Sequence, residues 1–172
     1  YGYELSEDNE YQIAPYYDTT GRLIAQKLRT KDKEFSITGS ASKMGLFGSQ
    51  LARRGGKMIV LCEGEIDAMS ISQSLGNTWP VLSLPNGSQN LAPVKDALEF
   101  LESYDKVVLC FDNDEPGHTA TEAVLSLLSP GKAYVTDLGE HKDANELLRQ
   151  DPQTLRNAIW DAREYRPDGV VN

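Results

Sequence analysis

KVVLCFDNDEPG, residues Lys106–Gly117, joins an apolar run directly to a group of carboxylates. The run Val107–Phe111 has the continuous hydrophobicity of a strand that is buried on both faces of a sheet. Asp112 and Asp114 follow at the point where such a strand leaves the core. Ligands of open parallel sheets bind beyond the carboxyl ends of the strands, so these two acids are candidates for a functional site.

Strands and helices alternate on both sides of this stretch. Further apolar runs predict strands at Met58–Cys62, Pro80–Leu84 and Ala133–Leu138. Hydrophobic residues at helical spacing predict helices at Glu65–Gly76, around a stripe of Leu91, Val94, Leu98 and Leu101, around an inner face of Ala120, Val124, Leu127 and Leu128, and at Asp143–Gln150 and Pro152–Tyr165. This order predicts an α/β fold with a parallel sheet that is flanked by helices on both faces.

The first 56 residues have a different pattern. Alternating hydrophobic residues and turn sequences predict strands at Tyr11–Asp18, Arg22–Thr30 and Glu34–Thr38, and a short helix at Leu46–Arg54 that ends at two glycines. We therefore expect a small α+β basic lobe at residues 1–56, an α/β domain at 57–150, and a C-terminal helix with the start of a linker at 151–172. The first residue is Tyr1 and Arg163–Asn172 is linker-like, which suggests a piece of a longer protein.

Composition limits the classes of function. The chain has 172 residues, 40% of them hydrophobic, and no apolar run approaches the roughly 18 residues that cross a membrane. Cys62 and Cys110 lie singly in apolar runs, which favours two buried thiols over a zinc site or a disulfide framework. The net charge is −9, yet residues 22–57 hold nine Lys and Arg against two acids. That block is either a solvated face or a cradle for a polyanion.

A third acid strengthens the case for a site. Glu63 follows the strand Met58–Cys62, and Gly64 allows a sharp turn into the next helix. If the two strands are neighbours, Glu63, Asp112 and Asp114 converge, and two carboxylates about 4 Å apart repel by roughly 4 kcal/mol at an effective dielectric near 20. Either a protonated carboxyl or a divalent cation would relieve the repulsion, and oxygen ligands alone favour Mg²⁺ or Mn²⁺. Alternatively, Asp112 and Asp114 only cap the helix that begins near Pro116.

Several stretches together resemble a known family. VLCEGEIDAM (Val60–Met69), with the Asp-x-Asp of the opening stretch, resembles the paired signature of the TOPRIM fold of primases, topoisomerases and some nucleases. LSLPNGSQN (Leu82–Asn90) and GEHKDANELL (Gly139–Leu148) are similar to the primase half of the bifunctional primase-helicases of T-odd phages. GRLIAQKLRT and KMGLFGS (Lys43–Ser49) resemble the basic lobe that precedes this fold in bacterial-type primases. The resemblance covers about residues 10–150.

The resemblance implies roles for individual residues. Glu63, Asp112 and Asp114 would be the catalytic acids and would bind metal, with Asp143 as a further metal-binding acid. Glu65 and Asp67 are weaker candidates, because acids are expected in the first turn of a helix. The residues implied to bind nucleotide or template are Lys27, Arg29, Lys43, Asn86, Gly87 and Lys142.

The implied activity is that of a DNA primase core. Such a core uses Mg²⁺ or Mn²⁺ to make short RNA primers from ribonucleoside triphosphates on a single-stranded DNA template. The expected location is the cytoplasm, in the host cell if the protein is from a phage, without a membrane partner. Zinc-binding and helicase domains would be partners within the full-length protein, since the sequence has neither a zinc-ribbon cysteine pattern nor a GxxxxGK[ST] loop.

Other functions remain open from the sequence. A TOPRIM nuclease or a topoisomerase fragment would use the same acids to break phosphodiester bonds. A non-catalytic TOPRIM recombination module would only bind DNA and partners, although it has no need to maintain a repulsive acidic set. Receiver domains also carry acids at strand ends, but they do not explain the basic lobe.

Overall fold

The N-terminal part of the chain is an antiparallel sheet with strand order β1-β2-β3-β4. The computed structural model describes residues 1–166. The strands are β1 (Glu4–Leu5), β2 (Tyr11–Tyr17), β3 (Leu23–Thr30) and β4 (Phe35–Gly39). The turn between β2 and β3 forms because Asp18 Oδ1 accepts hydrogen bonds from the backbone of Thr20 and Arg22, while Gly21 adopts a φ of +82°. The three strands expected here are confirmed.

The connection to the rest of the chain differs from expectation. It holds two short 3₁₀ turns, Ala41–Lys43 and Ser49–Leu51, and the helix predicted at Leu46–Arg54 is wrong. Phe47 instead exchanges two backbone hydrogen bonds with Ser83, at 2.9 and 3.2 Å. Gly48 then takes a left-handed φ of +86°. Because this pairing extends the backbone at Phe47, a continuous helix cannot form.

The second sheet has five strands in the order β6-β5-β7-β8-β9. They are β5 (Gly56–Cys62), β6 (Val81–Ser83), β7 (Tyr104–Cys110), β8 (Ala133–Val135) and β9 (Arg163–Glu164). The first four run parallel, as the apolar runs predict, whereas β9 pairs antiparallel with β8. The alternation of Met58, Val60 and Cys62 with Ile59 and Leu61 places successive residues in two separate hydrophobic clusters, which explains the unbroken apolar sequence.

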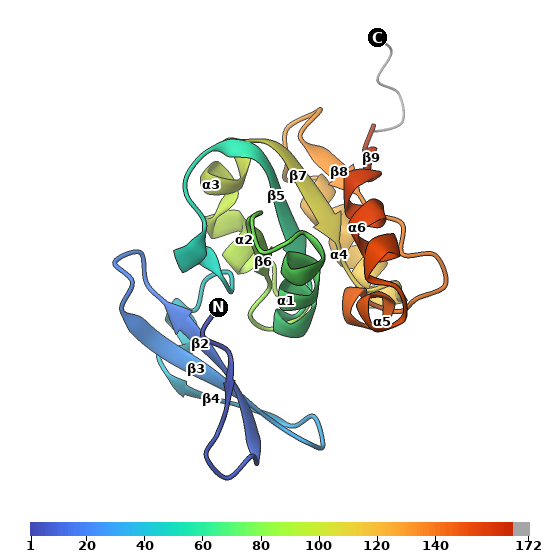
Figure 1. Cartoon of the computed structure of the whole chain (residues 1–172). Helices are drawn as coiled ribbons and strands as arrows, with labels where there is room; N and C mark the ends of the chain where they lie inside the picture. Colours follow the sequence, from blue (N-terminus) through green and yellow to red (C-terminus); the bar gives the residue numbers. More distant parts are fainter. Residues whose placement is uncertain (167–172) are drawn as a thin grey trace.

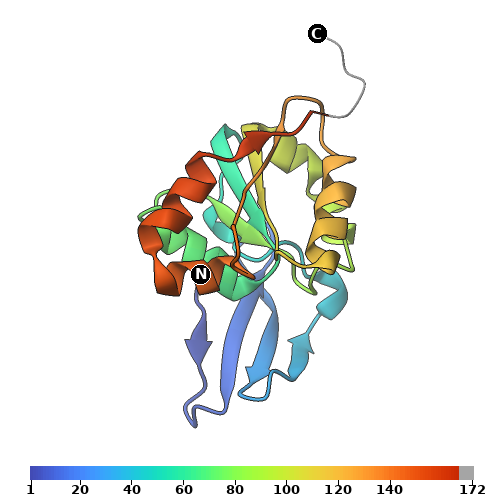
Figure 2. The same ribbon diagram turned by 90° about the vertical axis from the view of Figure 1, so that its right-hand side faces the viewer.

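Helices cover both faces of this sheet, as Figure 2 shows. They are α1 (Glu65–Ser74), α2 (Ala92–Asp96), α3 (Leu98–Glu102), α4 (Glu115–Leu125), α5 (Ala144–Gln150) and α6 (Pro152–Trp160). Residues of α1, α5 and α6 share one hydrophobic cluster, and residues of α2, α3 and α4 share the other. The stripe from Leu91 to Leu101 is divided into α2 and α3 at Ala97, so the single helix expected there is wrong.

The end of the described chain also differs from expectation. Helix α6 ends at Trp160, whose ring packs edge-on against Trp79 at 5.1 Å. The backbone then turns so that Arg163 and Glu164 pair with β8, which is why the helix does not continue to Tyr165. The rest of the predicted linker, residues 167–172, lies outside the described residues.

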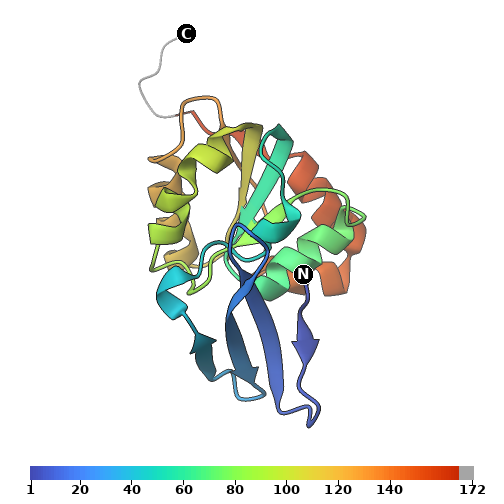
Figure 3. The same cartoon turned by 90° about the vertical axis from the view of Figure 1, so that its left-hand side faces the viewer.

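The two sheets meet near the carboxyl ends of β5 and β7. Figures 1 and 3 show the antiparallel sheet extending away from the α/β unit on that side. Tyr16 and Phe47 are buried at the junction, with ring centroids 5.6 Å apart. None of the helices in residues 1–166 is long and apolar enough to span a membrane.

Candidate active site at the carboxyl ends of the parallel strands

Strand register brings the first two acids to one edge of the sheet. Strands β5 and β7 are neighbours, and Cys62 pairs with Cys110 at their carboxyl ends. Glu63 is one residue beyond this pair and Asp112 is two residues beyond it, so both acids leave neighbouring strands at the same edge of the sheet. Burial raises the pKa of Asp112 to about 7, with further upward contributions from the charges of Glu63, Asp67, Asp143 and Asp114. The charges of these acids thus act on Asp112, and their joint use as a site stays a prediction.

Asp67 belongs to the same group of acids. Burial raises its pKa to about 6, and the charges of Asp143, Glu63 and Glu65 add to the increase. The backbone N–H of Asn145 donates a hydrogen bond to Asp67 Oδ1 at 3.0 Å, which opposes the increase. In the sequence, Asp67 carried less weight because it lies in a first helical turn, where acids are common. In the structure the charges of Asp143 and Glu63 act on Asp67, which makes it a stronger candidate for the site.

Two of the acids also cap helices. Asp114 Oδ1 accepts a hydrogen bond from Gly117 N at 2.9 Å at the start of α4, and Asp143 Oδ1 accepts one from Glu146 N at 2.8 Å at the start of α5. Of the two capping roles considered for the Asp-x-Asp, the one for Asp114 is confirmed, and Asp112 is not the capping residue. Each capping bond uses Oδ1 and fixes the direction of the side chain.

Asn113 joins two loops of the site. Its Nδ2 donates to Gly139 O at 2.8 Å, and its backbone N donates to Lys142 O at 2.6 Å. Its Oδ1 lies 3.0 Å from His118 Nε2. These bonds hold the loop that precedes Asp143 against the Asp-x-Asp loop. Sequence reasoning missed this role, because an Asn between two Asp residues gives no signal of what its side chain contacts.

Gly117 is a second residue that sequence reasoning did not identify. A Cβ at this position would lie 2.0 Å from the carbonyl oxygen of Asp112, so only glycine lets α4 start this close to the strand end. The same close approach allows Gly117 N to reach the carboxylate of Asp114. The local signal was the Pro-Gly pair in a predicted helical first turn, where glycine is otherwise unfavourable.

The donor atoms fit a hard divalent cation by chemistry. Among residues 1–166, no three His, Cys, Asp or Glu side chains are already grouped as a metal site. Nevertheless, Glu63 Oε2 is buried and has no hydrogen-bond partner in that part of the chain, which is costly for a carboxylate oxygen unless a cation is its partner. This oxygen therefore fits a cation ligand, and the capping bonds of Asp114 and Asp143 use only Oδ1 of each carboxylate.

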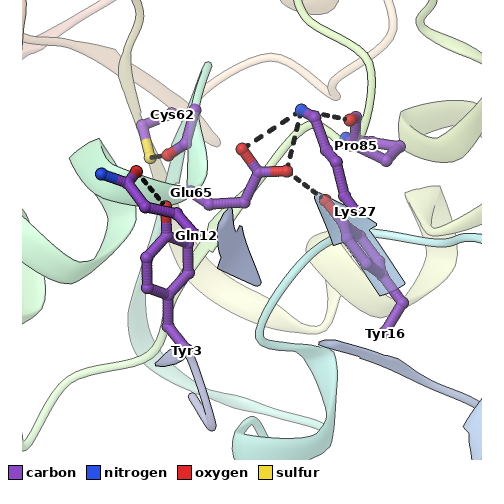
Figure 4. Close-up of polar contacts among 8 residues, drawn as sticks. Tyr3, Gln12, Tyr16, Lys27, Cys62, Glu65 and Pro85 are labelled. Carbon is purple, nitrogen blue, oxygen red and sulfur yellow. Dashed lines mark hydrogen bonds and ion pairs between the residues drawn. The ribbon is translucent and has the colours of Figure 1, made fainter. Parts of the chain in front are cut away.

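Lys27 lies at the joint between the two sheets rather than at an open surface (Figure 4). Its Nζ lies 2.9 Å from Glu65 Oε1 and 2.9 Å from Pro85 O, and Tyr16 donates a hydrogen bond to the same Glu65 oxygen at 2.6 Å. The side chains of Lys27 and Glu65 are only 12% and 10% exposed. This geometry gives Lys27 an architectural contact, and its expected nucleotide contact stays a prediction.

The other residues expected to bind nucleotide or template lie on several separate elements. Gly87, with a φ of +70°, is close to Glu63: a Cβ there would lie 3.9 Å from Glu63 Oε1. Asn86 is exposed in the same loop, and Lys142 is exposed next to Asp143. Arg29 lies on β3, and Lys43 is exposed at the end of the first 3₁₀ turn. Their contacts with a ligand stay predictions.

Comparison with known proteins agrees with this geometry. A family model described as Toprim-like matches residues 60–148, and a model described as the N-terminal a+b fold of bacteriophage T7 DNA helicase/primase matches residues 1–39. The DNA helicase/primase of Enterobacteria phage T3 is 38% identical over 99% of the chain. The chain spans 31% of that relative and 17% of the DNA primase of Campylobacter jejuni, which is 35% identical over 61% of the chain.

Solved structures give the same result. The primase fragment of the bacteriophage T7 primase-helicase protein has a TM-score of 0.80 and 36% identity, covering 87% of this chain and 62% of that one. Primase domains bound to an RNA/DNA hybrid and dTTP, in a complex with the T7 lagging-strand DNA polymerase, give 0.81 and 37%, covering 92% and 81%. The Aquifex aeolicus primase, at 20% identity and a TM-score of 0.72 over 91% of this chain and 41% of that one, shows a shared fold. The chain therefore belongs to the Toprim-like family, among the primase segments of phage primase-helicases.

Proposed function

We propose that this chain is the catalytic core of a DNA primase, which joins ribonucleotides into short primers on single-stranded DNA. The observation that carries the proposal is that Glu63 and Asp112 follow neighbouring parallel strands at the same edge of the sheet, in a chain with primase relatives. The excess of cations in residues 22–57 suits a polyanionic template. Selection of the template site and unwinding of DNA are assigned to zinc-binding and helicase domains of a longer protein.

The acidic residues would hold Mg²⁺ or Mn²⁺. Glu63, Asp112 and Asp114 are the proposed ligands, with Asp143 and Asp67 beside them, and a bound dication would neutralise the α-phosphate of the incoming nucleotide and make the 3′-hydroxyl easier to ionise. Mg²⁺ suits this set because it prefers carboxylate oxygens and retains water ligands. The raised pKa values of Asp112 and Asp67 are consistent with a site whose carboxylates become fully charged only when a cation is present.

The reaction requires the chain to position its substrates. The 3′-oxygen of the growing primer forms a bond to the α-phosphorus, the α–β phosphoanhydride bond breaks, and pyrophosphate leaves while the hydroxyl proton passes to solvent. Lys142 and Lys43 are the exposed cations proposed to neutralise the triphosphate. The loop with Asn86 and Gly87 lies next to Glu63 and offers a small backbone surface to a nucleotide. Positioning of this kind supplies much of the rate acceleration in phosphoryl transfer.

Primer synthesis by the isolated chain tests the proposal. Incubation with ribonucleoside triphosphates, Mg²⁺ and single-stranded DNA is expected to yield short RNA and pyrophosphate, and Asp112→Asn should abolish both. The exposed Asp105, on the same strand but at its opposite end, provides the control Asp105→Asn, which should retain activity. Cleaved DNA without RNA would instead identify a nuclease. DNA binding with neither product would identify a recombination module.

A further inference from the structure

An exposed aromatic ring lies beside two cations of the antiparallel sheet. Phe35 is at the start of β4, an edge strand, and is 57% exposed. Lys27 Nζ lies 4.8 Å from the centroid of its ring, and Arg29 Cζ lies 5.7 Å from it. Both distances are within the range of cation–π contacts, which hold the ring in place without covering it.

The strand register defines the face to which these residues belong. Arg29 pairs with Phe35 and Lys27 pairs with Ile37, so their side chains lie on one face of the antiparallel sheet. Ile37 is also 36% exposed, and all five residues of β4 are exposed to solvent. An edge strand with exposed apolar residues promotes aggregation, so such a strand often marks a surface that binds a partner.

This face is continuous with the acidic site. Lys27 Nζ, next to the ring of Phe35, also contacts Pro85 O at 2.9 Å. Pro85 begins the loop in which Gly87 approaches Glu63 Oε1. A strand of nucleic acid that reaches the acids could therefore cross the ring of Phe35 on the way.

Charge decides which partner fits the face. Lys27 is paired with Glu65, so Arg29 is the cation of the face that is left beside the ring. The hairpin that joins β3 to β4 adds Lys31 and Lys33 together with Asp32 and Glu34, and the exposed Lys31 lies 3.9 Å from Glu10. A partner with negative charges and exposed flat apolar groups complements such a surface. Single-stranded nucleic acid has both, because its phosphates are charged and its bases are free to stack, whereas duplex bases are already stacked.

We propose that Phe35 is a stacking platform for one base of the single-stranded DNA template, and that Arg29 contacts a phosphate beside that base. This assignment deepens the proposed primase function and rests on it, because it names the residue that holds the template next to the acidic site.

Affinity measurements separate stacking from charge. Loss of a stacked base by Phe35→Ala should weaken binding of a single-stranded DNA oligonucleotide by about 5- to 100-fold, without changing the dependence of the binding constant on salt. Arg29→Ala should also weaken binding, but it should reduce the slope of log K against log salt by about 0.7, the value for one lost phosphate contact on a single strand. Leu51→Ala is the matched control, because Leu51 is also 57% exposed but lies outside the sheet.

Two further measurements locate the base. In Phe35→Trp, stacking should quench fluorescence more than in the wild-type chain, where Trp79 and Trp160 pack against each other. Scanning one abasic position along the oligonucleotide should weaken binding to the wild-type chain at one position only. The Phe35→Ala variant should be insensitive to that position.

The results distinguish failure of the platform from failure of the primase proposal. If Phe35→Ala melts as the wild-type chain does and binds DNA equally well, the platform is wrong, whether or not primers are made. Preferential loss of binding to an RNA oligonucleotide would assign the ring to the product rather than the template, which overturns the proposal as stated. If the wild-type chain binds single-stranded DNA but makes no primer, the primase function fails while the platform stands.

Discussion

Glu65 and Asp67 lie two residues apart in the first turn of α1, yet their carboxylates have opposite surroundings. Glu65 is buried against the cation of Lys27 and the hydroxyl of Tyr16. Because both partners belong to the antiparallel sheet, Glu65 links that sheet to the α/β unit. Asp67 is buried among other acids and has a raised pKa. The comparison shows how an architectural carboxylate differs from a site carboxylate: the first has its charge neutralised within the chain, and the second keeps an unbalanced charge that a ligand can use.

Loss of the cation that neutralises Glu65 should have the largest effect on stability. Lys27→Met leaves Glu65 buried without its cation, which should lower the free energy of unfolding by about 3–5 kcal/mol. Urea denaturation of the chain measures this change.

A double variant provides the control for Lys27→Met. Adding Glu65→Gln removes the buried charge while an amide oxygen still accepts the hydrogen bond from Tyr16, so much of the lost stability should return. If the double variant is as unstable as the sum of the two single variants, the ion pair does not join the sheets.

A side chain added at Gly117, next to the acids, should have the next largest effect on stability. In Gly117→Ala, the new Cβ would meet Asp112 O at 2.0 Å, so the loop or the helix start must move. We expect a loss of about 1–3 kcal/mol in the free energy of unfolding, and loss of primer synthesis. Gly45→Ala is the matched control, because a Cβ at Gly45 meets nothing within 4 Å. A Gly117→Ala variant as stable and active as Gly45→Ala would contradict the close approach.

Removing the charge of Asp112 should have a smaller effect on stability, and this effect should be an increase. The pKa of Asp112 is about 7 in the fold against an ordinary value of 3.8, so its charge destabilises the fold and stability falls as pH rises from about 4 to about 7. Asp112→Asn should therefore raise stability at pH 8 by about 1 kcal/mol, after allowance for solvent screening of a partly exposed group. Thermal melts should show a larger gain at pH 8 than at pH 5, and little gain below pH 4.

Magnesium provides the control for this prediction. Excess Mg²⁺ should stabilise the wild-type chain at pH 8, since binding to the folded state alone raises stability, and it should do so far less in Asp112→Asn. If the variant is less stable than the wild type at both pH values, Asp112 has a structural role that its contacts do not show.

Sequence patterns predicted the parallel sheet better than the contacts between the two sheets. Buried parallel strands leave continuous apolar runs, and acids after such runs must lie at one edge, so Glu63 and Asp112 could be paired from the sequence. The partner of Glu65 could not be predicted, because an acid in a first helical turn has the same sequence signature whether it faces solvent, Lys27 or the site. The 3₁₀ turn at Ser49–Leu51 depends in the same way on the distant pairing of Phe47 with Ser83.

The smallest effect on stability is expected at the loop contact of Asn113. This exposed side chain donates to Gly139 O and His141 O, and Asn113→Ala should cost only about 0.5–1.5 kcal/mol in the free energy of unfolding. The same bonds hold the loop that leads to Asp143. The rate of primer synthesis should therefore fall more than the small loss of stability alone would explain. His118→Ala is the control, since it removes the contact with Asn113 Oδ1 but keeps both bonds to the loop. Equal activity losses in the two variants would mean that Asn113 does not position Asp143.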